Sequence, residues 1–200
     1  MLTRHVYGAI RLIRGLQDLF VNGRPERAGA ATVEGAFIPA DQFTRMYQHC
    51  ERQAGSHEVM GLLLGDHFVD SIGAYTYIFQ SISGSYESNM VHVRFTKAGI
   101  ADISSALADF KSNSQYCPID RTGLNGRVCP KCSYDVNDTK IVGWYHSHPG
   151  HTAFMSGTDL ETQRNNEFVI SIVIDPLHEE CKVWQSVHAT LQEIALYAVE

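Results

Sequence analysis

Residues 143–150 read GWYHSHPG, and residues 156–159 follow with SGTD. On a β-strand, residues two apart point to the same side, so His146 and His148 can both reach one cation. A proline and a glycine then end the strand, and the chain re-enters as a helix whose first turn offers the carboxylate of Asp159. Two imidazole nitrogens and one carboxylate oxygen leave a fourth tetrahedral position open. This is the ligand arrangement of a catalytic zinc rather than a structural one.

The same residues also have plainer interpretations. Ser156, followed three residues later by Asp159, is a passable capping box for a helix. A His-x-His pair on a strand can equally be two hydrogen-bonded core histidines. The joint occurrence of both histidines, Pro149, Ser156 and Asp159 in one short block favours the metal site over either alternative.

The composition is that of an ordinary globular protein. The chain has 200 residues, 44% apolar and 19% charged, which predicts one sizeable domain and excludes a disordered chain. Its net charge of −6 argues against nucleic acid or an anionic membrane as a partner. No apolar stretch approaches the ~18 residues of a membrane span, and arginines interrupt any signal peptide. We therefore expect a cytoplasmic protein in a reducing compartment, where clustered cysteines more often bind metal than pair.

Residues 1–32 are predicted to be an addition to the main domain, which then covers residues 33–200. Within residues 1–32, apolar residues recur every three to four positions, which indicates an amphipathic helix. The residues of this stripe are Leu2, Val6, Ile10, Ile13, Leu16 and Phe20. Residues 22–32 are rich in glycine, alanine and arginine and indicate a linker. We expect the helix to pack on its own domain, with binding of a partner as the alternative.

The main domain mixes strands and helices without strict alternation, so an α+β fold is expected. Apolar and β-branched runs predict strands, and apolar residues at helical spacing predict helices. The predicted strands are 36–38, 59–64 (with Gly65 after it), 75–82, 141–146 and 168–174. The predicted helices are 41–55 (with Asp41 as the cap), 96–110 and 156–166. Residues 181–188 and 191–199 complete the sheet or add a last helix.

The block from residue 143 to residue 159 resembles the signature of the JAMM (MPN+) zinc metalloprotease family. That signature is a distant upstream glutamate, then His-Ser/Thr-His-Pro, six residues, a serine, two residues and an aspartate. The matching positions are His146, Ser147, His148, Pro149, Ser156 and Asp159. Residues 58–65 (EVMGLLLG) look like the family's glutamate strand. Residues 143–145 (GWY) and 173–176 (VIDP) are similar to the proteasome-lid deubiquitinase and signalosome deneddylase branch.

The resemblance implies an MPN (JAB) domain of cytidine-deaminase-like type, with a mixed sheet curled around and flanked by helices. It implies that His146, His148 and Asp159 hold one catalytic zinc. Glu58 would be the general base that moves a proton from the zinc water to the leaving amine, and Ser156 would donate to the oxyanion. The implied activity is that of a deubiquitinase-type isopeptidase. The implied partners are conjugates of ubiquitin or a ubiquitin-like protein, and the proteasome or a related ATPase.

The C-terminal tail of ubiquitin ends in two glycines and offers little side chain to grip. An isopeptidase must therefore hold the backbone, most simply by adding it as a strand at a sheet edge. The polar segment 81–91 is our candidate for that edge, with Gly84, Ser85 and Asn89 as candidate contacts. A plain surface loop is the alternative.

Two features depart from the eukaryotic members of the family. Residues 153–155 are Ala-Phe-Met where those members have Cys-Trp-Leu, which keeps an aromatic and loses a cysteine outside the ligand set. The sequence also ends at Glu200, without the long C-terminal helices that seat eukaryotic members in complexes. A compact archaeal or prokaryotic-type member is therefore expected. Two alternatives stay open: a non-catalytic MPN scaffold or ubiquitin-binding module, and a JAMM peptidase acting on a sulfur-carrier conjugate.

A segment at about 114–138 carries Cys117, Cys129 and Cys132, which resemble part of a zinc ribbon. A second, structural zinc is one interpretation, and a disulfide or free thiols are the others. The candidates for a missing fourth ligand are Asp120, Asp135, Cys50 and a histidine. Since this segment precedes the His146 strand, it could shape the substrate cleft.

Overall fold

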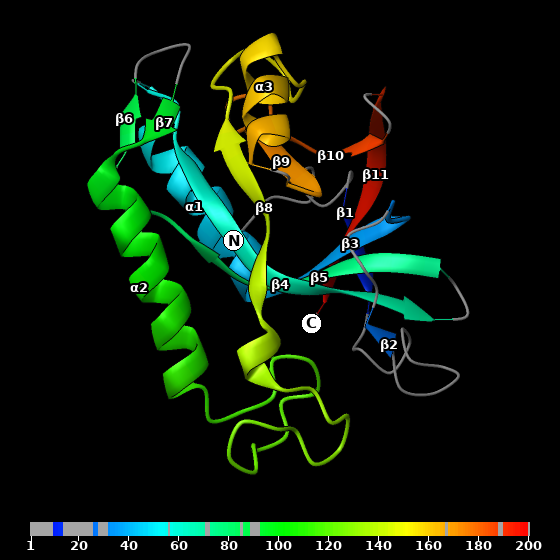
Figure 1. The fold of residues 1–200 in the computed structure, drawn as a ribbon. Coiled ribbons are helices and arrows are strands. Elements are labelled where there is room, and N and C mark those ends of the chain that lie inside the picture. Colours follow the sequence, from blue (N-terminus) through cyan, green and yellow to red (C-terminus); the bar gives the residue numbers. More distant parts are fainter. Residues whose placement is uncertain are drawn as a thin grey trace.

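The computed structural model describes residues 10–13, 26–27, 32–55, 57–70, 73–84, 86–88, 93–166, 168–187 and 190–199 (Figure 1). Its strands are β1 (Ile10–Ile13), β2 (Glu26–Arg27), β3 (Gly35–Pro39), β4 (Met60–Asp70), β5 (Gly73–Ile82), β6 (Tyr86–Ser88), β7 (Val93–Phe95), β8 (Lys140–Ser147), β9 (Ile170–Asp175), β10 (Glu180–Val187) and β11 (Thr190–Val199). Its helices are α1 (Ala40–Gln53), α2 (Lys97–Asn113) and α3 (Gly157–Asn165), with a short 3-10 helix at Val136–Asp138.

One large curled sheet organises the fold. Its strands run in the order β1-β11-β10-β9-β8-β4-β5-β3, and β3 also pairs with β11, so the sheet closes on itself. β2 adds to β4, while β6 and β7 form a separate hairpin. Parallel pairs (β8 with β9, β3 with β5 and β11) stand among antiparallel ones, so the sheet is mixed. The predicted α+β fold with a curled mixed sheet is confirmed.

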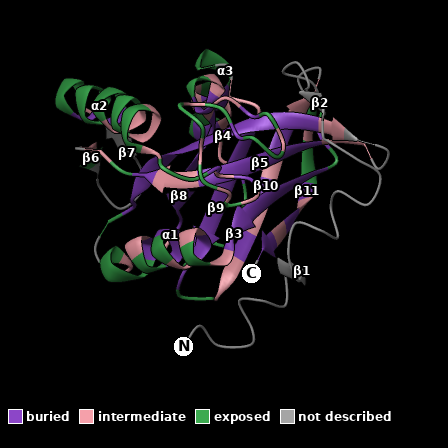
Figure 2. Ribbon diagram, turned by 90° about the horizontal axis from the view of Figure 1, so that it is seen from below, coloured by how far each residue is buried: buried purple, intermediate pink, exposed green. Residues whose placement is uncertain are grey.

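Helices cover both sides of this sheet (Figure 2). On one side, α1 buries four side chains in the core at the spacing that the sequence predicted: Phe43, Met46, Tyr47 and Cys50. On the other side, Ile103 of α2 shares a core cluster with Trp144 of β8. Among the described residues, no helix combines the length and apolar character that crossing a membrane requires.

The start of α1 differs from its prediction. The helix begins at Ala40 with Pro39 in the N-cap position, so Asp41 lies in the first turn and is not the cap. Pro39 is also the last residue of β3, where it pairs with Val199 of β11. The strand therefore passes directly into the helix, because proline fixes a φ angle that suits both ends.

The predicted end of β4 at Leu64, before Gly65, was also wrong, because the strand continues to Asp70. The pairing of β4 with β5 shifts by one residue between Leu64 and Gly65. A Cβ atom at Gly65 would lie 2.1 Å from the carbonyl oxygen of Tyr77. Glycine here permits a close approach of two strands at a bulge rather than a turn.

Little of the predicted N-terminal addition lies in the described residues. Ile10–Ile13 form β1, parallel to β11, so the predicted helix is wrong at these four positions. The edge of β11 supplies backbone hydrogen-bond partners there, and this pairing outweighs the helical spacing of the side chains. Glu26–Arg27 form β2 within the predicted linker. The rest of residues 1–31 lies outside the described residues, so the boundary between residues 32 and 33 stays a prediction.

The cysteine-containing segment lies between α2 and β8. Cys117 and Cys129 share a buried cluster with Phe68 of β4 and with Tyr77 and other aromatic residues of β5. Figure 1 shows this segment at the start of β8 and α3 near the strand's other end. A strand rises about 3.3 Å per residue, so the eight residues of β8 separate its two ends by more than about 20 Å. The expectation that this segment shapes a cleft at the histidines therefore finds no support in the fold.

Candidate metal centre

The register between β4 and β8 brings the predicted site residues together. Met60 pairs with His146. Extending this antiparallel register by two residues places Glu58 opposite His148, just beyond the ends of both strands. Because side chains alternate along a strand, Glu58, His146 and His148 lie on the same side of the sheet.

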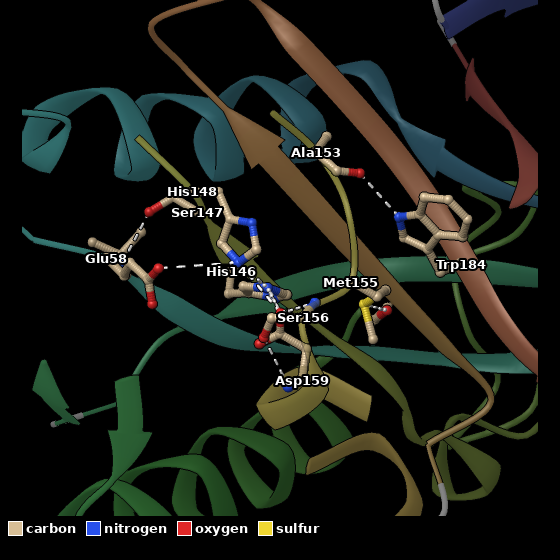
Figure 3. Close-up of polar contacts among 11 residues, drawn as sticks. Glu58, His146, Ser147, His148, Ala153, Met155, Ser156, Asp159 and Trp184 are labelled. Carbon is tan, nitrogen blue, oxygen red and sulfur yellow. Dashed lines mark hydrogen bonds and ion pairs between the residues drawn. The ribbon is translucent and has the colours of Figure 1, made fainter. Parts of the chain in front are cut away.

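Three candidate ligand atoms meet beyond the end of β8 (Figure 3). His146 Nε2 lies 3.1 Å from His148 Nε2, and each of these nitrogens lies 3.3 Å from Asp159 Oδ2. A tetrahedral zinc with bonds of about 2.0–2.1 Å has ligand atoms about 3.3–3.4 Å apart. The triangle therefore has the size of one face of a zinc tetrahedron. Two imidazole nitrogens and a carboxylate oxygen are also ligands that zinc prefers, so these residues fit a zinc ion.

The first turn of α3 positions Asp159. Ser156 Oγ accepts a hydrogen bond from the backbone N–H of Asp159 (3.2 Å), and Asp159 Oδ2 accepts one from the N–H of Ser156 (2.8 Å). The capping box that the sequence offered as an alternative is thus present. It does not compete with a metal site, because the oxygen that closes the box also faces both histidines. The cap fixes the orientation of the carboxylate.

Burial and mutual contacts set the charges of the three residues. Burial lowers the pKa of His146 despite the nearby Asp159, which keeps its imidazole neutral and able to bind a metal. Burial lowers the pKa of His148 as well, but the hydrogen bond that its ring donates to Asp159, together with the charges of Asp159 and Glu58, outweighs burial, so the net shift is upward. For Asp159 burial raises the pKa, yet its hydrogen bonds with both histidines hold the pKa well below its usual range. The Asp159 carboxylate therefore stays ionised and offers an anionic oxygen to a cation.

Glu58 lies beside the triangle without being part of it. The residue is 6% exposed, and its Oε1 atom lies 4.0 Å from His148 Nε2. Burial raises the pKa of Glu58 to about 7, an effect that His148 opposes and Asp159 reinforces. A carboxyl group that titrates near neutral pH next to a metal position is suited to accept a proton and to return it.

Ser147 has a positioning role that the sequence did not reveal. Its Oγ accepts a hydrogen bond from the N–H of Val59, and its own N–H donates to the carbonyl oxygen of Val59, both at 2.9 Å. These bonds fasten the residue next to Glu58 to the residue between the two histidines. The available signal was a serine between two candidate ligands, but only the pairing of β4 with β8 identifies its partner.

Asp175, at the end of β9, anchors the loop that joins β8 to α3. Its carboxylate accepts hydrogen bonds from the N–H groups of Gly150 (2.9 Å) and Thr152 (3.0 Å). Farther along the loop, the indole N–H of Trp184 donates to the carbonyl oxygen of Ala153 at 3.1 Å (Figure 3). The loop that carries the chain from the strand ligands to the helix ligand is thus held by β9 and β10.

The candidate contacts for a substrate tail are described only in part. Gly84 lies against the start of α2, where a Cβ atom would be 2.6 Å from the carbonyl oxygen of Gly99. Ser85 and Asn89 lie outside the described residues. The assignment of this segment as a tail-binding edge therefore stays a prediction.

Comparison with known protein families matches residues 31–171 to the family described as JAB1/Mov34/MPN/PAD-1 ubiquitin protease. The chain belongs to this family. The match covers more than half of the 200 residues, and it confirms both the resemblance and the MPN fold that the sequence indicated. The expected archaeal or prokaryotic source stays a prediction.

Curated relatives of this JAB/MPN chain include subunits of two large complexes. The 26S proteasome regulatory subunit RPN11 of Eremothecium gossypii is 30% identical over 175 residues, which cover 81% of this chain and 47% of that protein. The ubiquitin carboxyl-terminal hydrolase RPN11 of Saccharomyces cerevisiae is 28% identical over 170 residues (81% and 46%). The COP9 signalosome complex subunit 5 of Debaryomyces hansenii is 26% identical over 167 residues (82% and 30%). The chain thus spans about half the length of these relatives, or less.

Among solved structures, the solution structure of protein DSY2949 from Desulfitobacterium hafniense matches with a TM-score of 0.50 and 16% identity. The match covers 82% of this chain and 94% of that one. At this identity the likeness shows a shared fold alone.

Proposed function

We propose that this JAB/MPN chain is a zinc-dependent isopeptidase. It hydrolyses the bond between the C-terminal glycine of ubiquitin or a ubiquitin-like modifier and a substrate lysine. The observation that carries the proposal is the convergence of ligand atoms from His146, His148 and Asp159, with Glu58 beside them. A scaffold or binding module needs neither a complete ligand triangle nor a buried carboxyl group next to it.

The proposed chemistry divides between the ion and Glu58. His146, His148 and Asp159 would hold a zinc ion, which would supply a Lewis acid for the scissile carbonyl and make a water molecule acidic enough to react near neutral pH. Glu58 takes a proton from the attacking water and delivers it to the lysine nitrogen as the C–N bond breaks and the glycine carboxyl forms. Proton transfer of this kind typically contributes about 10²–10⁴-fold to the rate.

Ser156 is the proposed donor to the oxyanion. Its Oγ accepts a hydrogen bond from the N–H of Asp159, and that bond leaves the hydroxyl hydrogen available to donate. One such donor typically contributes about 10²–10³-fold. The same hydroxyl thus serves the helix cap and the reaction.

The substrate class rests on the relatives and on the β6–β7 hairpin. One relative is named a ubiquitin carboxyl-terminal hydrolase. The hairpin lies at the same end of the molecule as α3 (Figure 1), and the Tyr86 hydroxyl at its start is joined through the His49 ring to the Tyr145 hydroxyl of β8. We infer that the segment 81–91 binds the extended tail by strand addition. The proposal includes a cytoplasmic location and the proteasome or a related ATPase as partner, because relatives are named as 26S proteasome subunits.

The test is a cleavage assay of the purified chain on isopeptide-linked diubiquitin and on ubiquitin-like fusions. We expect cleavage that a zinc chelator abolishes and added zinc restores. His148→Ala should be inactive, whereas His151→Ala, which removes an exposed histidine three residues away, should cleave like the wild type. A zinc-loaded chain that cleaves none of these substrates would favour the scaffold or binding module. Cleavage of a sulfur-carrier fusion alone would favour the third alternative.

A further inference from the structure

The cysteine-containing segment is built from two turns of the same construction. Residues 117–122 read CPIDRT, and residues 129–134 read CPKCSY. In each turn the N–H of the first cysteine donates to the carbonyl oxygen five residues later, at 2.7 and 2.8 Å. In each turn the carbonyl oxygen of that cysteine accepts from the N–H four residues later, at 2.9 and 2.8 Å. Aligning the two turns therefore places Asp120 at the position of Cys132.

The first sulfur of each turn accepts a hydrogen bond from a backbone N–H of the same turn, two residues later in the first turn and three residues later in the second. Cys117 Sγ accepts from the N–H of Ile119, and Cys129 Sγ accepts from the N–H of Cys132, both at 3.4 Å. Backbone N–H groups that point at a sulfur stabilise a thiolate more than a thiol, because they offset its negative charge. In each turn this bond would offset part of the negative charge of a thiolate ligand.

The backbone after each second ligand position repeats as well. Arg121 and Ser133 take left-handed φ angles of 59° and 57°. A residue with a Cβ atom adopts this region at a cost of about 1–2 kcal/mol. Both turns have a residue in this unfavourable region at the same position, which is further evidence that the two turns share one backbone structure.

The two turns lie close together, and the first ligand position of each turn contacts the second ligand position of the other. Cys117 Sγ lies 3.5 Å from Cys132 Sγ, and Cys129 Sγ lies 3.5 Å from both carboxylate oxygens of Asp120. One ligand atom from each residue lies within 4.8 Å of all the others. In a tetrahedral zinc site with Zn–S bonds of about 2.3 Å and a Zn–O bond of about 2.0–2.2 Å, ligand atoms lie about 3.5–3.8 Å apart. The Cys117–Cys132 and Cys129–Asp120 distances have this length.

The other candidates for a fourth ligand are occupied elsewhere. Cys50 lies in the core cluster under α1, away from the cluster that contains Cys117 and Cys129. Asp135 caps the 3-10 helix, where its Oδ1 accepts from the N–H of Asn137 at 2.9 Å. All five cysteines of the chain are free thiols in the structure. Among the described residues, no histidine joins this group of ligand atoms, so Asp120 is the residue that completes the set.

A bound ion would cross-link this part of the chain. Outside the 3-10 helix, residues 114–138 are joined by isolated bridges, at Tyr116 with Gly123 and at Val128 with Asn125 and Asp135, rather than by a strand ladder. One ion held by both turns would stabilise their folded arrangement, because it would offset part of the conformational freedom that they lose on folding.

We propose that Cys117, Asp120, Cys129 and Cys132 bind one zinc ion in a closed structural site. Three thiolates favour zinc over the hard cations magnesium and calcium. Four protein ligands leave no position for water, so the ion holds the two turns together and takes no part in hydrolysis.

Metal analysis of the full chain separates this site from the proposed catalytic one. We expect the wild type to bind two zinc ions and the His146→Ala/His148→Ala double variant to retain one. Cobalt(II) added to that double variant should give a sulfur-to-cobalt charge-transfer band in the near ultraviolet. The histidine–aspartate centre has no sulfur ligand and cannot give this band. A double variant with neither zinc nor the band would overturn the proposal and leave the isopeptidase proposal untouched.

Single variants test the ligand set. Cys132→Ser and Asp120→Ala should each lose the ion and the band, while Asp120→Cys should keep the ion and intensify the band through a fourth sulfur. Cys181→Ala is the matched control, because it removes a buried cysteine outside the cluster and should change neither. If Cys132→Ser does not fold, the mass of wild-type protein isolated without reductant decides the matter. A disulfide between Cys117 and Cys132 in that protein would overturn the proposal, and zinc with all thiols reduced would support it.

Discussion

The two clusters near the ends of β8 differ in what holds them. Beyond the end of the strand, His146, His148 and Asp159 project from a strand end and a capped helix, both fixed by the sheet. Before its beginning, four candidate ligands within residues 117–132 come from two short turns. A site built on sheet and helix can leave one corner open, because the fold holds its ligands without the ion. A site built on turns needs a full ligand set, because the ion holds the turns.

Asp159→Ala should have the largest effect on hydrolysis, because it removes one of three ligands. We expect the zinc of the histidine centre to be lost, with a fall in kcat/KM of about 10⁴-fold or more, since a metal ion supplies several kcal/mol to such a reaction. The zinc of the cysteine site should remain. Metal analysis and the cleavage assay measure the two effects.

Asp159→Asn is the control for the helix cap. Its amide oxygen can still accept the hydrogen bond from the Ser156 N–H, so α3 should stay capped while the ligand charge is lost. Undiminished zinc in Asp159→Ala would show that the ligand assignment is wrong.

Glu58→Gln should have the next largest effect, because it removes the proton acceptor and no ligand. Both zinc ions should remain, and kcat should fall by about 10²–10⁴-fold. Glu51→Gln, at an exposed glutamate of α1, is the matched control and should behave like the wild type. Cleavage by Glu58→Gln at the wild-type rate would exclude Glu58 as the base.

The fall of kcat/KM at acid pH also tests the assignment of Glu58 as the base. Burial raises the pKa of Glu58 to about 7, and a cation beside it lowers this value by favouring the carboxylate. Glu58 accepts a proton only when ionised, so kcat/KM should fall about tenfold per pH unit below a pKa at or under about 7. Metal content measured at each pH separates this loss from protonation of the ligands. The residual activity of Glu58→Gln should not fall in this way at acid pH. If it does fall in the same way, the titrating group is not Glu58.

Ser147→Ala should have a smaller effect through the position of Glu58. It removes the acceptor of the Val59 N–H, and an unpaired buried donor costs about 1–3 kcal/mol of stability. We expect kcat to fall about tenfold, because Glu58 is displaced. Zinc content and KM should stay nearly unchanged, because the ligands keep their positions. Ser147→Thr, which keeps the hydroxyl, should restore most of the rate. Equal losses in both variants would point to packing rather than to the hydrogen bond.

The sequence predicted the local part of the histidine centre and not the part that depends on strand pairing. His146, His148 and Asp159 lie within one strand, one turn and one helix start, so spacing alone relates them. Glu58 lies far upstream, and spacing cannot choose it among the other acids. Only the family resemblance indicated it before the pairing of β4 with β8 placed it. The N-terminal strand was missed for the same reason, since β1 forms on a distant partner, β11.

For the cysteine cluster, the sequence predicted three of the ligands but could not identify the fourth. Three sulfur ligands were visible as a pattern, but the fourth was open among Asp120, Asp135, Cys50 and a histidine. The first turn carries aspartate where the second carries Cys132, so a search for paired Cys-x-x-Cys motifs does not find it. The matching backbone hydrogen bonds of the two turns reveal the equivalence.

The smallest effect on hydrolysis is expected from the cysteine cluster, and this expectation most directly tests the contrast between the two sites. Cys132→Ser removes a ligand at the opposite end of β8, so kcat/KM should change by less than about threefold at temperatures where the chain stays folded. Its thermal midpoint should fall by about 5–10 °C, because a structural ion stabilises only the folded state. Cys181→Ser, at a buried cysteine away from the cluster, controls for loss of a thiol. If Cys132→Ser stayed folded with zinc at the histidines yet lost hydrolysis as Asp159→Ala does, the two sites would be coupled and the contrast would be wrong.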